Sequence, residues 1–327
     1  MLKRSSIVTD PTELQRYYLG LERLSTRALW TLPAPPTEPR SRAVPHVWHW
    51  RDVRPEAMRA AELVGTQEAE RRVLLLSNPG TPGLWATNTL SANVQVVMPG
   101  EIARSHRHTP AALRMVIESS GGYTAVNGEK LAMLPGDLVL TPSWTWHDHA
   151  NDSDAPMIWL DGLDSGLIRM LEATFYEPYP YETQPVRDAL SVSPWRYPYI
   201  ETRAALDKQA LQGHVDPFDG VILEYKNPVT GGPVMHTIGC YLQLLRPGDH
   251  TRAHRHTSNS AYHVIEGEGF TIVGDTRLDW EDKDVFVVPT WMFHEHVNTG
   301  GRDAVLFSHT DAPTMRALGV WREESRD

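Results

Sequence analysis

Eight of the fifteen histidines fall in four short His-x-His pairs, and these pairs are the residues whose spacing is best suited to chemistry. The pairs are His106 with His108, His147 with His149, His254 with His256, and His294 with His296. Because residues i and i+2 of a strand point to the same face, each pair presents two imidazoles side by side. Imidazole is the commonest side-chain ligand for zinc, copper, iron and nickel. A lone pair of this kind is more often hydrogen-bonded than metal-bound, but its repetition favours a metal site.

The histidine pairs belong to an internal repeat. The segment QVVMPGEIARSHRHT (95–109) aligns with QLLRPGDHTRAHRHT (243–257) at an offset of 148 residues. At an offset of 147 residues, DLVLTPSWTWHDHAN (137–151) matches DVFVVPTWMFHEHVN (284–298). Solenoid repeats have periods of about 20–50 residues, so this much longer spacing indicates a duplicated domain.

Short strands must position these histidines. From Arg72 onward, apolar segments of strand length are separated by Gly, Pro and Asn, and residues 218–310 show the same pattern again. Strands this short and evenly spaced predict an antiparallel barrel or sandwich in each half of the chain.

Helices are predicted at three places outside the strands. Residues 10–30 have apolar side chains at helical spacing behind Asp10, which can cap the first turn. A proline-rich stretch over 31–45 predicts an extended connector. A short helix is predicted to start near Pro55, and another to occupy residues 164–174, between the two strand-rich regions.

The histidine segments resemble a known family. GEIARSHRH followed by GDLVLTPSWTWHDHAN resembles the two cupin motifs, and the duplication makes the chain a bicupin. Over roughly residues 70–310 the chain resembles the gentisate 1,2-dioxygenases and their salicylate- and hydroxynaphthoate-cleaving relatives. The resemblance implies a mainly β fold of two tandem double-stranded β-helix (jelly-roll) barrels with flanking helices. It also implies a homotetramer.

The resemblance divides the chain into four parts. Residues 1–70 are expected to form an N-terminal helical arm and connector, and residues 71–165 the N-terminal cupin with the catalytic iron. Residues 166–217 are expected to form a helical linker, and residues 218–327 the C-terminal cupin and tail.

The resemblance implies that His106, His108 and His147 bind one Fe(II). Cupins usually carry a glutamate four or five residues after the second histidine, but here those positions are Ala112 and Leu113. Ferrous iron often takes six ligands, so three neutral histidines leave three positions for a chelating 2-hydroxybenzoate and dioxygen. The implied reaction is extradiol-type ring cleavage of gentisate (2,5-dihydroxybenzoate) to maleylpyruvate, with O2 inserted between the carboxyl- and hydroxyl-bearing carbons. Salicylate, substituted salicylates and 1-hydroxy-2-naphthoate present the same chelating pair.

The two copies differ at the positions expected to contact substrate. Arg114 aligns with Tyr262 and Asp161 with Ser308, so of the two aligned positions only the first copy carries an arginine six residues after its second histidine. Without the motif glutamate, Arg114 is expected to face the substrate carboxylate instead of a protein anion, and arginine can hold a carboxylate by two parallel hydrogen bonds. A surface position for Arg114 is the alternative.

Further substrate contacts follow from the resemblance. His149, Asp161 and Gln95 align with substrate-lining positions of the family, and His149, Arg114 and Asp161 are the expected catalytic residues. Asp161 could instead be a strand-end cap, and Gln95 could serve the barrel itself because Gln243 repeats it. One of Arg71 and Arg72 is expected to supply a second cation, but strand alternation alone does not show which.

The second copy retains a full histidine triad. His254, His256 and His294 are either a second metal site or a hydrogen-bonded remnant of the duplication. With Tyr262 in place of Arg114, this copy is less suited to an acidic aromatic substrate.

Composition excludes several other classes. The formal net charge of -10 argues against a nucleic-acid or anionic-membrane partner. The sequence contains no apolar run of about 18 residues, and its first residues lack the apolar core of a signal peptide, so a cytoplasmic location is expected. Cys240 is the only cysteine, which excludes an internal disulfide.

Two other functions compete with ring cleavage. A manganese-dependent bicupin decarboxylase or oxidase of small acids usually has the glutamate that both copies lack. A non-catalytic bicupin that binds a small ligand or stores nitrogen would not need the triad and Arg114 together.

Overall fold

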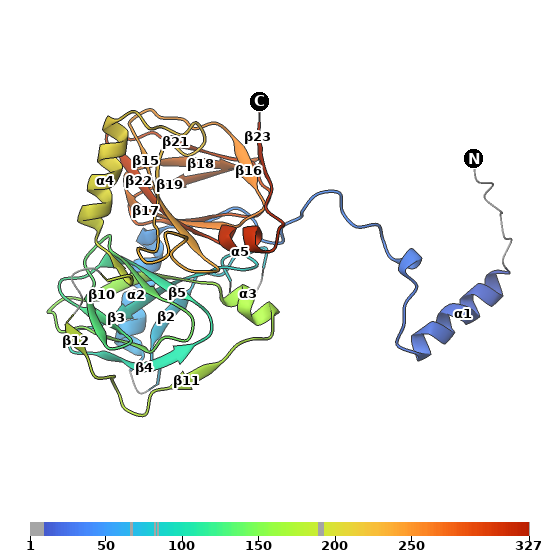
Figure 1. Ribbon diagram of the computed structural model, residues 1–327, viewed down its shortest axis with the longest axis horizontal. Coiled ribbons are helices and arrows are strands. Elements are labelled where there is room, and N and C mark those ends of the chain that lie inside the picture. Colours follow the sequence, from blue (N-terminus) through green and yellow to red (C-terminus); the bar gives the residue numbers. More distant parts are fainter. Residues whose placement is uncertain (1–9, 66–67, 82, 84, 189–192, 327) are drawn as a thin grey trace. The chain divides into compact units, whose positions relative to one another are not determined.

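The computed structural model describes residues 10–65, 68–81, 83, 85–188 and 193–326. The chain divides into two compact units, Met1–Pro39 and Arg40–Asp327 (Figure 1). None of the helices in the described part of the chain has the length and apolar character that a membrane span requires.

The first unit contains helix α1 (Pro11–Arg23) and a 3-10 turn (Leu29–Thr31). The carboxylate of Asp10 accepts a hydrogen bond from the main-chain nitrogen of Thr12 at 3.0 Å, which confirms the predicted cap. The helix is shorter than the predicted 10–30. The chain leaves the helical path at Ser25, whose φ is 54°.

The second unit holds two similar sets of strands. The first set comprises β2 (Arg72–Leu75), β3 (Ser91–Val97), β4 (Ile102–His108), β5 (Ala112–Glu118), β6 (Tyr123–Val126), β7 (Glu129–Ala132), β8 (Leu138–Thr141), β9 (His147–Ala150), β10 (Met157–Leu163), β11 (Tyr176–Pro178), β12 (Arg187–Asp188) and β13 (Arg196–Tyr197). They form two sheets with the strand orders β13-β8-β5-β10-β3-β2 and β11-β4-β9-β6-β7-β12.

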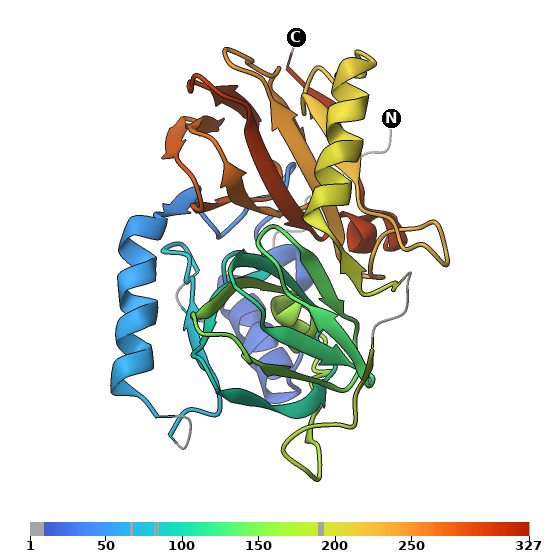
Figure 2. The same ribbon diagram turned by 90° about the vertical axis from the view of Figure 1, so that its left-hand side faces the viewer.

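The second set repeats this arrangement. It comprises β1 (His46–Trp48), β14 (Val221–Glu224), β15 (Gly239–Leu245), β16 (His254–His256), β17 (Ser260–Glu266), β18 (Gly269–Val273), β19 (Thr276–Trp280), β20 (Val285–Val288), β21 (His294–Asn298), β22 (Ala304–Thr310) and β23 (Glu323–Ser325). The sheet order β1-β20-β17-β22-β15-β14 corresponds to β13-β8-β5-β10-β3-β2 position by position. The five-stranded order β23-β16-β21-β18-β19 corresponds to β11-β4-β9-β6-β7, and in the described part of the chain β12 has no counterpart. The predicted duplication and the bicupin fold are therefore confirmed; Figure 2 shows the two cupins, green and orange-red, next to each other.

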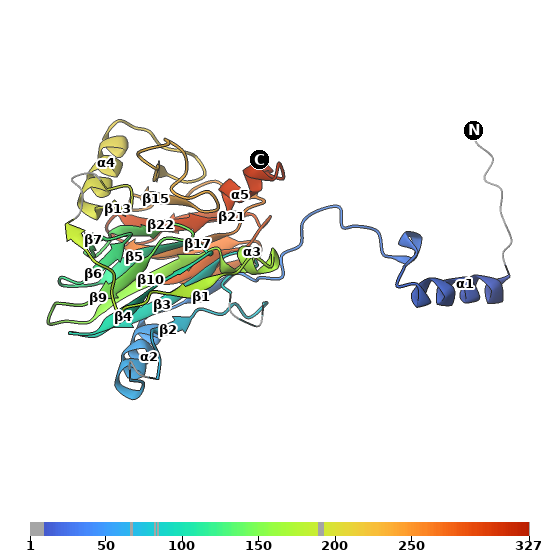
Figure 3. The same cartoon turned by 60° about the horizontal axis from the view of Figure 1, so that its bottom comes forward.

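Among the residues that the structure describes, four helices flank the cupins: α2 (Trp50–Leu63), α3 (Ser165–Met170), α4 (Tyr199–Leu211) and α5 (Ala312–Ala317). Helix α2 lies alongside β2 and β3 (Figure 3). It begins earlier than predicted from Pro55, because Asp284 of the second cupin accepts a hydrogen bond from the Trp50 main-chain nitrogen at 2.7 Å. Helix α3 is shorter than the predicted 164–174, and the chain turns at Glu172, whose φ is 55°.

Strand alternation divides each cupin between two apolar cores. On β5, Leu113, Met115 and Ile117 share one hydrophobic cluster with residues of the second cupin. The intervening Val116 belongs to a separate cluster inside the first barrel. Arg114 has the same parity as Val116 and therefore points into the barrel. The packing of one cupin on the other thus fixes which face of β5 lines the interior.

Candidate metal centre

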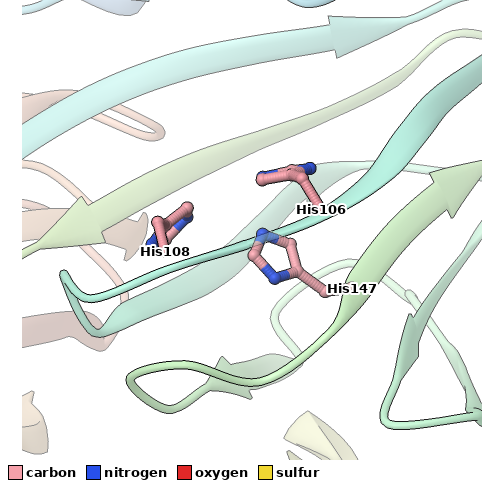
Figure 4. A group of neighbouring side chains, drawn as sticks. All are labelled: His106, His108 and His147. Carbon is pink, nitrogen blue, oxygen red and sulfur yellow. The ribbon is translucent and has the colours of Figure 1, made fainter. Parts of the chain in front are cut away.

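Three imidazoles converge inside the first cupin. His106 and His108 come from β4 and His147 from the neighbouring strand β9 (Figure 4). The ring centroids lie 4.2 Å apart for His106 and His147, 4.9 Å for His108 and His147, and 5.4 Å for His106 and His108. One ring nitrogen from each histidine lies within 4.8 Å of the others. His106 and His147 are register partners in the β4–β9 pair, which is why residues 41 positions apart meet.

Main-chain carbonyls orient all three rings. The Nδ1 atoms of His106, His108 and His147 lie 2.9, 2.7 and 3.0 Å from carbonyl oxygens, those of Arg104, Pro110 and Thr145 respectively. A carbonyl can only accept, so each Nδ1 carries the hydrogen and each Nε2 keeps its lone pair. This is the outer-shell arrangement typical of metal-binding histidines. The Nε2 of His147 is buried and, among the described residues, has no hydrogen-bond partner.

The environment keeps the triad neutral. Burial, reinforced by the nearby Arg71 guanidinium, lowers the pKa of His106 to about 2. Burial also lowers the pKa of His108 to about 4, and that of His147 well below its usual value. Because the neutral imidazole is the form that coordinates metals, the donor set fits a divalent ion.

The register of β2 decides between the two adjacent arginines. Val73 pairs with Gln95 of β3, and Arg72 pairs with Val96, whose side chain lies in the core between the cupins. Arg71 therefore shares the inner face, and its Nη1 donates to the Nε2 of His106 at 2.6 Å.

Arg72 does not contact the histidine triad. Its guanidinium is buried on the other side of the strand, where Nη1 donates to the carbonyl of Ala61 at 2.9 Å. Its Nη2 forms an ion pair with Glu101.

Arg114 is buried opposite Asp161. The two residues are register partners on β5 and β10, and Arg114 Nε lies 3.6 Å from Asp161 Oδ1. Arg114 Nη1 also donates to Thr141 Oγ1. The expectation that Arg114 would face no protein anion is therefore wrong. Asp161 is not a strand-end cap, because it lies within β10, where it accepts a hydrogen bond from Trp159 Nε1 at 2.9 Å.

His149 and Gln95 line the same interior. His149 is buried with its Nδ1 2.7 Å from Thr124 Oγ1, and its ring centroid lies 6.0 Å from that of His147. Burial, followed by the charge of Arg114, lowers the pKa of His149 well below its usual value. Gln95 is the register partner of Trp159, and within the described chain its buried Nε2 has no partner.

Sequence reasoning missed two residues of this interior. Asn93 pairs in register with Asp161, and its buried Oδ1 lacks a hydrogen-bond partner in the part of the chain described. Its place two residues before Gln95 on a strand was the available signal. Tyr176 of β11 stacks on His106 at a ring-centroid distance of 5.5 Å. Nothing in its local sequence indicated this contact.

Known proteins resemble this chain over most of its length. The cupin domain family matches residues 93–162 and 241–310. The chain is 38% identical over 335 residues to gentisate 1,2-dioxygenase 1 of Aquipseudomonas alcaligenes, covering 95% of this chain and 96% of that protein. It is 43% identical over 312 residues to 5-aminosalicylate 1,2-dioxygenase of Comamonas sp, covering 88% and 83%.

A solved structure shows the same fold. The salicylate 1,2-dioxygenase of Pseudaminobacter salicylatoxidans superimposes with a TM-score of 0.89 at 33% identity, covering 97% of this chain and 99% of that one. Sequence relatives and solved structure agree over nearly the whole chain. The chain therefore belongs to the gentisate 1,2-dioxygenase family of ring-cleaving bicupin dioxygenases.

Proposed function

We propose that this protein is an Fe(II)-dependent, extradiol-type dioxygenase that cleaves gentisate to maleylpyruvate, inserting O2 between the carboxyl- and hydroxyl-bearing ring carbons. The observation that carries the proposal is that two buried or inward-facing arginines, Arg114 and Arg71, stand beside a neutral histidine triad in one barrel. The histidines can bind a metal and the arginines can bind the carboxylate of an aromatic acid, so the two sets together suit a metal-dependent reaction of such an acid.

His106, His108 and His147 would hold the iron through their Nε2 atoms. A ferrous ion bound there would supply a redox-active centre with free positions for the substrate oxygens and for dioxygen. Three neutral ligands leave the ion its full charge, which favours an anionic chelating substrate over a neutral one.

The chain's own groups would hold the substrate. Arg71 Nη1 donates to the His106 lone pair that an ion would use, so metal binding would release this guanidinium next to the centre. Once Arg71 is released, it and Arg114 can both donate hydrogen bonds to the substrate carboxylate. His149, kept neutral by burial and fixed at Nδ1 by Thr124, offers its Nε2 to a substrate oxygen.

A hydrogen-bond donor at ring position 5 suits the polar end of this interior. Asn93 Oδ1 is a buried acceptor without a partner among the described residues, and Asp161 is its register neighbour. Gentisate carries a hydroxyl at position 5. The same acceptors suit the amino group of 5-aminosalicylate, the substrate named for the relative from Comamonas sp, and this is the second candidate substrate. Salicylate and 1-hydroxy-2-naphthoate lack such a donor.

The experiment is anaerobic loading with Fe(II), followed by oxygen uptake and product absorbance for a panel of aromatic acids. Gentisate and 5-aminosalicylate are expected to give the highest kcat/KM, followed by salicylate and 1-hydroxy-2-naphthoate. A fully iron-loaded protein that consumes no oxygen with any of them would favour a non-catalytic, ligand-binding bicupin. Oxygen uptake only with the manganese-loaded protein would contradict the choice of metal.

We further propose that the enzyme acts as a homotetramer in the cytoplasm, which the family resemblance supports. Light scattering of the purified protein is expected to give four times the 36.9 kDa chain mass.

A further inference from the structure

The C-terminal cupin contains a second convergent triad. His254 and His256 come from β16 and His294 from β21. The ring centroids lie 4.3 Å apart for His254 and His294, 5.0 Å for His256 and His294, and 5.6 Å for His254 and His256. One ring nitrogen from each lies within 4.8 Å of the others. The ligand atoms of both triads therefore fall within the same 4.8 Å limit, although the surroundings of the two triads differ.

Two of these rings are oriented by carbonyls, as in the first cupin. The Nδ1 atoms of His256 and His294 lie 3.1 Å from the carbonyl oxygens of Ser258 and Met292. The third ring differs. His254 Nδ1 is buried and has no hydrogen-bond partner among the residues described, and a carboxylate oxygen of Glu323 lies 3.8 Å from it.

Glu323 reaches this place on the C-terminal tail. Strand β23 pairs antiparallel with β16, which sets Glu323 opposite His256. The ring of Trp321 stacks on His256 at a centroid distance of 5.7 Å. In the first cupin β11 pairs with β4 in the same way, and the residue opposite His108 is Tyr176. The tail therefore brings a carboxylate where the first cupin has a phenol.

The pocket beside this triad has the opposite charge character from the first site. A cavity of about 140 Å³ lies beside the triad, and most of the residues that line it are uncharged. Its charged lining residues are Asp219, Glu323 and Arg316. Tyr262 and Ser308 are register partners there, in the places of Arg114 and Asp161. Arg316 is the only cation among the lining residues that the structure describes, and its guanidinium lies 4.4 Å from the centre of the Trp321 ring.

We propose that the C-terminal cupin is a second divalent-metal site that does not accept the aromatic acid, and that Glu323 of the tail is its positioning residue. His254, His256 and His294 hold the ion, and the Glu323 carboxylate fixes His254 through Nδ1, as carboxylates do for many metal-binding histidines. The Glu323 carboxylate favours a cation, and Tyr262 stands where the first site has the arginine that would hold an anionic substrate. The metal fastens the tail to the barrel through His254 and Glu323.

The test separates this site from the first one. His147→Ala disables the first triad, so Co(II) added to the metal-free, full-length variant reports on the second triad through calorimetry and visible absorption. One Co(II) per chain is expected. Adding Glu323→Gln is expected to weaken binding 10- to 100-fold, the usual cost of losing an outer-shell partner. Adding His294→Ala is expected to abolish it.

Glu324→Gln is the matched control. Glu324 lies on the same strand but pairs with Arg255 at 2.7 Å on the outside, so its loss is expected to leave Co(II) affinity within about twofold. Equal affinities for the Glu323→Gln and Glu324→Gln proteins would overturn the positioning role. A folded His147→Ala protein that binds no Co(II) would overturn the metal site itself.

Gentisate tests the exclusion of substrate. Added to the Co(II)-loaded His147→Ala protein, it is expected to leave the visible bands unchanged, because Tyr262 replaces Arg114 and the one cation among the described lining residues, Arg316, lies against the Trp321 ring. A shift of the bands at about 1 mM gentisate would show that the second site also takes the acid.

Discussion

Arg114 and Asp161 face each other across β5 and β10, with Arg114 Nε 3.6 Å from Asp161 Oδ1 inside the first barrel. In the second barrel Tyr262 and Ser308 form the same register pair across β17 and β22. The duplication has therefore kept the backbone pairing and changed the side chains that face the pocket. The first cupin has an arginine, paired with Asp161, that can also donate to a substrate carboxylate. The second cupin has two hydroxyl groups at these positions.

Replacing Arg114 tests its proposed contact with the substrate carboxylate. Losing a charge-assisted hydrogen-bond pair costs ~1.5–3 kcal/mol, so Arg114→Ala is expected to lower kcat/KM for gentisate at least about tenfold. Arg114→Lys is expected to recover only part, since it keeps the charge without the fork. Iron content should not change, because Arg114 is not a ligand. Near-normal kcat/KM in the Ala variant would assign the carboxylate to Arg71 or His149 instead.

Asp161→Asn tests the polar end of the pocket. The charged carboxylate is a stronger acceptor than an amide by about 1 kcal/mol, so kcat/KM for gentisate is expected to fall about fivefold. Salicylate has no 5-hydroxyl and should be affected less. The measurement is the ratio of the two kcat/KM values in each protein. An equal fall for both substrates would show that Asp161 acts through Arg114 and not on the 5-hydroxyl.

The adjacent arginines are expected to give opposite phenotypes. Arg71→Met should lower kcat/KM about tenfold or more and leave the melting temperature nearly unchanged. Arg72→Met breaks a buried ion pair with Glu101, which typically costs ~3–5 kcal/mol of folding stability. The folded Arg72→Met protein should nevertheless retain most of its kcat/KM. Activity and thermal unfolding measured on both variants check the assignment, and the reverse pattern would refute it.

His147 and His149 lie two residues apart but have different expected roles. His147→Ala should remove both the first-site iron and turnover, because it takes away one of three ligands. His149→Ala should keep the iron, since its Nδ1 is bonded to Thr124 and it is outside the triad, but should lose most of the turnover. Iron analysis and oxygen uptake on the same samples distinguish the two. Full iron and full activity in His147→Ala would show that the site is assigned wrongly.

Asp219 is expected to make stability depend on pH. Burial, together with the nearby carboxylates of Asp216 and Glu323, raises the pKa of Asp219 to about 7. The folded state therefore holds this proton more tightly than the unfolded chain, whose Asp pKa is about 3.9. The stabilisation that this proton provides is complete below about pH 4 and is lost as the pH rises to about 7.

Asp219→Asn should remove that pH dependence. The amide oxygen can still accept the 2.8 Å hydrogen bond from Gln243, so the variant is expected to unfold at a higher temperature than the parent at pH 8. The difference in the free energy of unfolding should shrink by about 1.4 kcal/mol for each unit by which the pH falls from 7 toward 5. Thermal unfolding of the metal-free proteins from pH 5 to 8 provides the measurement. A constant difference across this range would contradict the raised pKa.

The sequence by itself determined the features that are local along the chain. The four His-x-His pairs, their repetition and the cupin motifs were readable because ligands two residues apart on a strand share a face whatever the strand pairs with. The duplicated fold followed from the same repeats. Arg114 could be placed beside the first site because its partner in the second copy, Tyr262, differs in charge.

Only the tertiary structure decided which distant residues meet. The choice of Arg71 over Arg72 depends on how β2 pairs with β3, and a slip of one residue would exchange their faces. The Arg114–Asp161 pair depends in the same way on the register of β5 and β10. Glu323 reaches His254 because the tail adds a strand to the second barrel. Strand register is set by packing between segments far apart in the chain, and no local pattern encodes it.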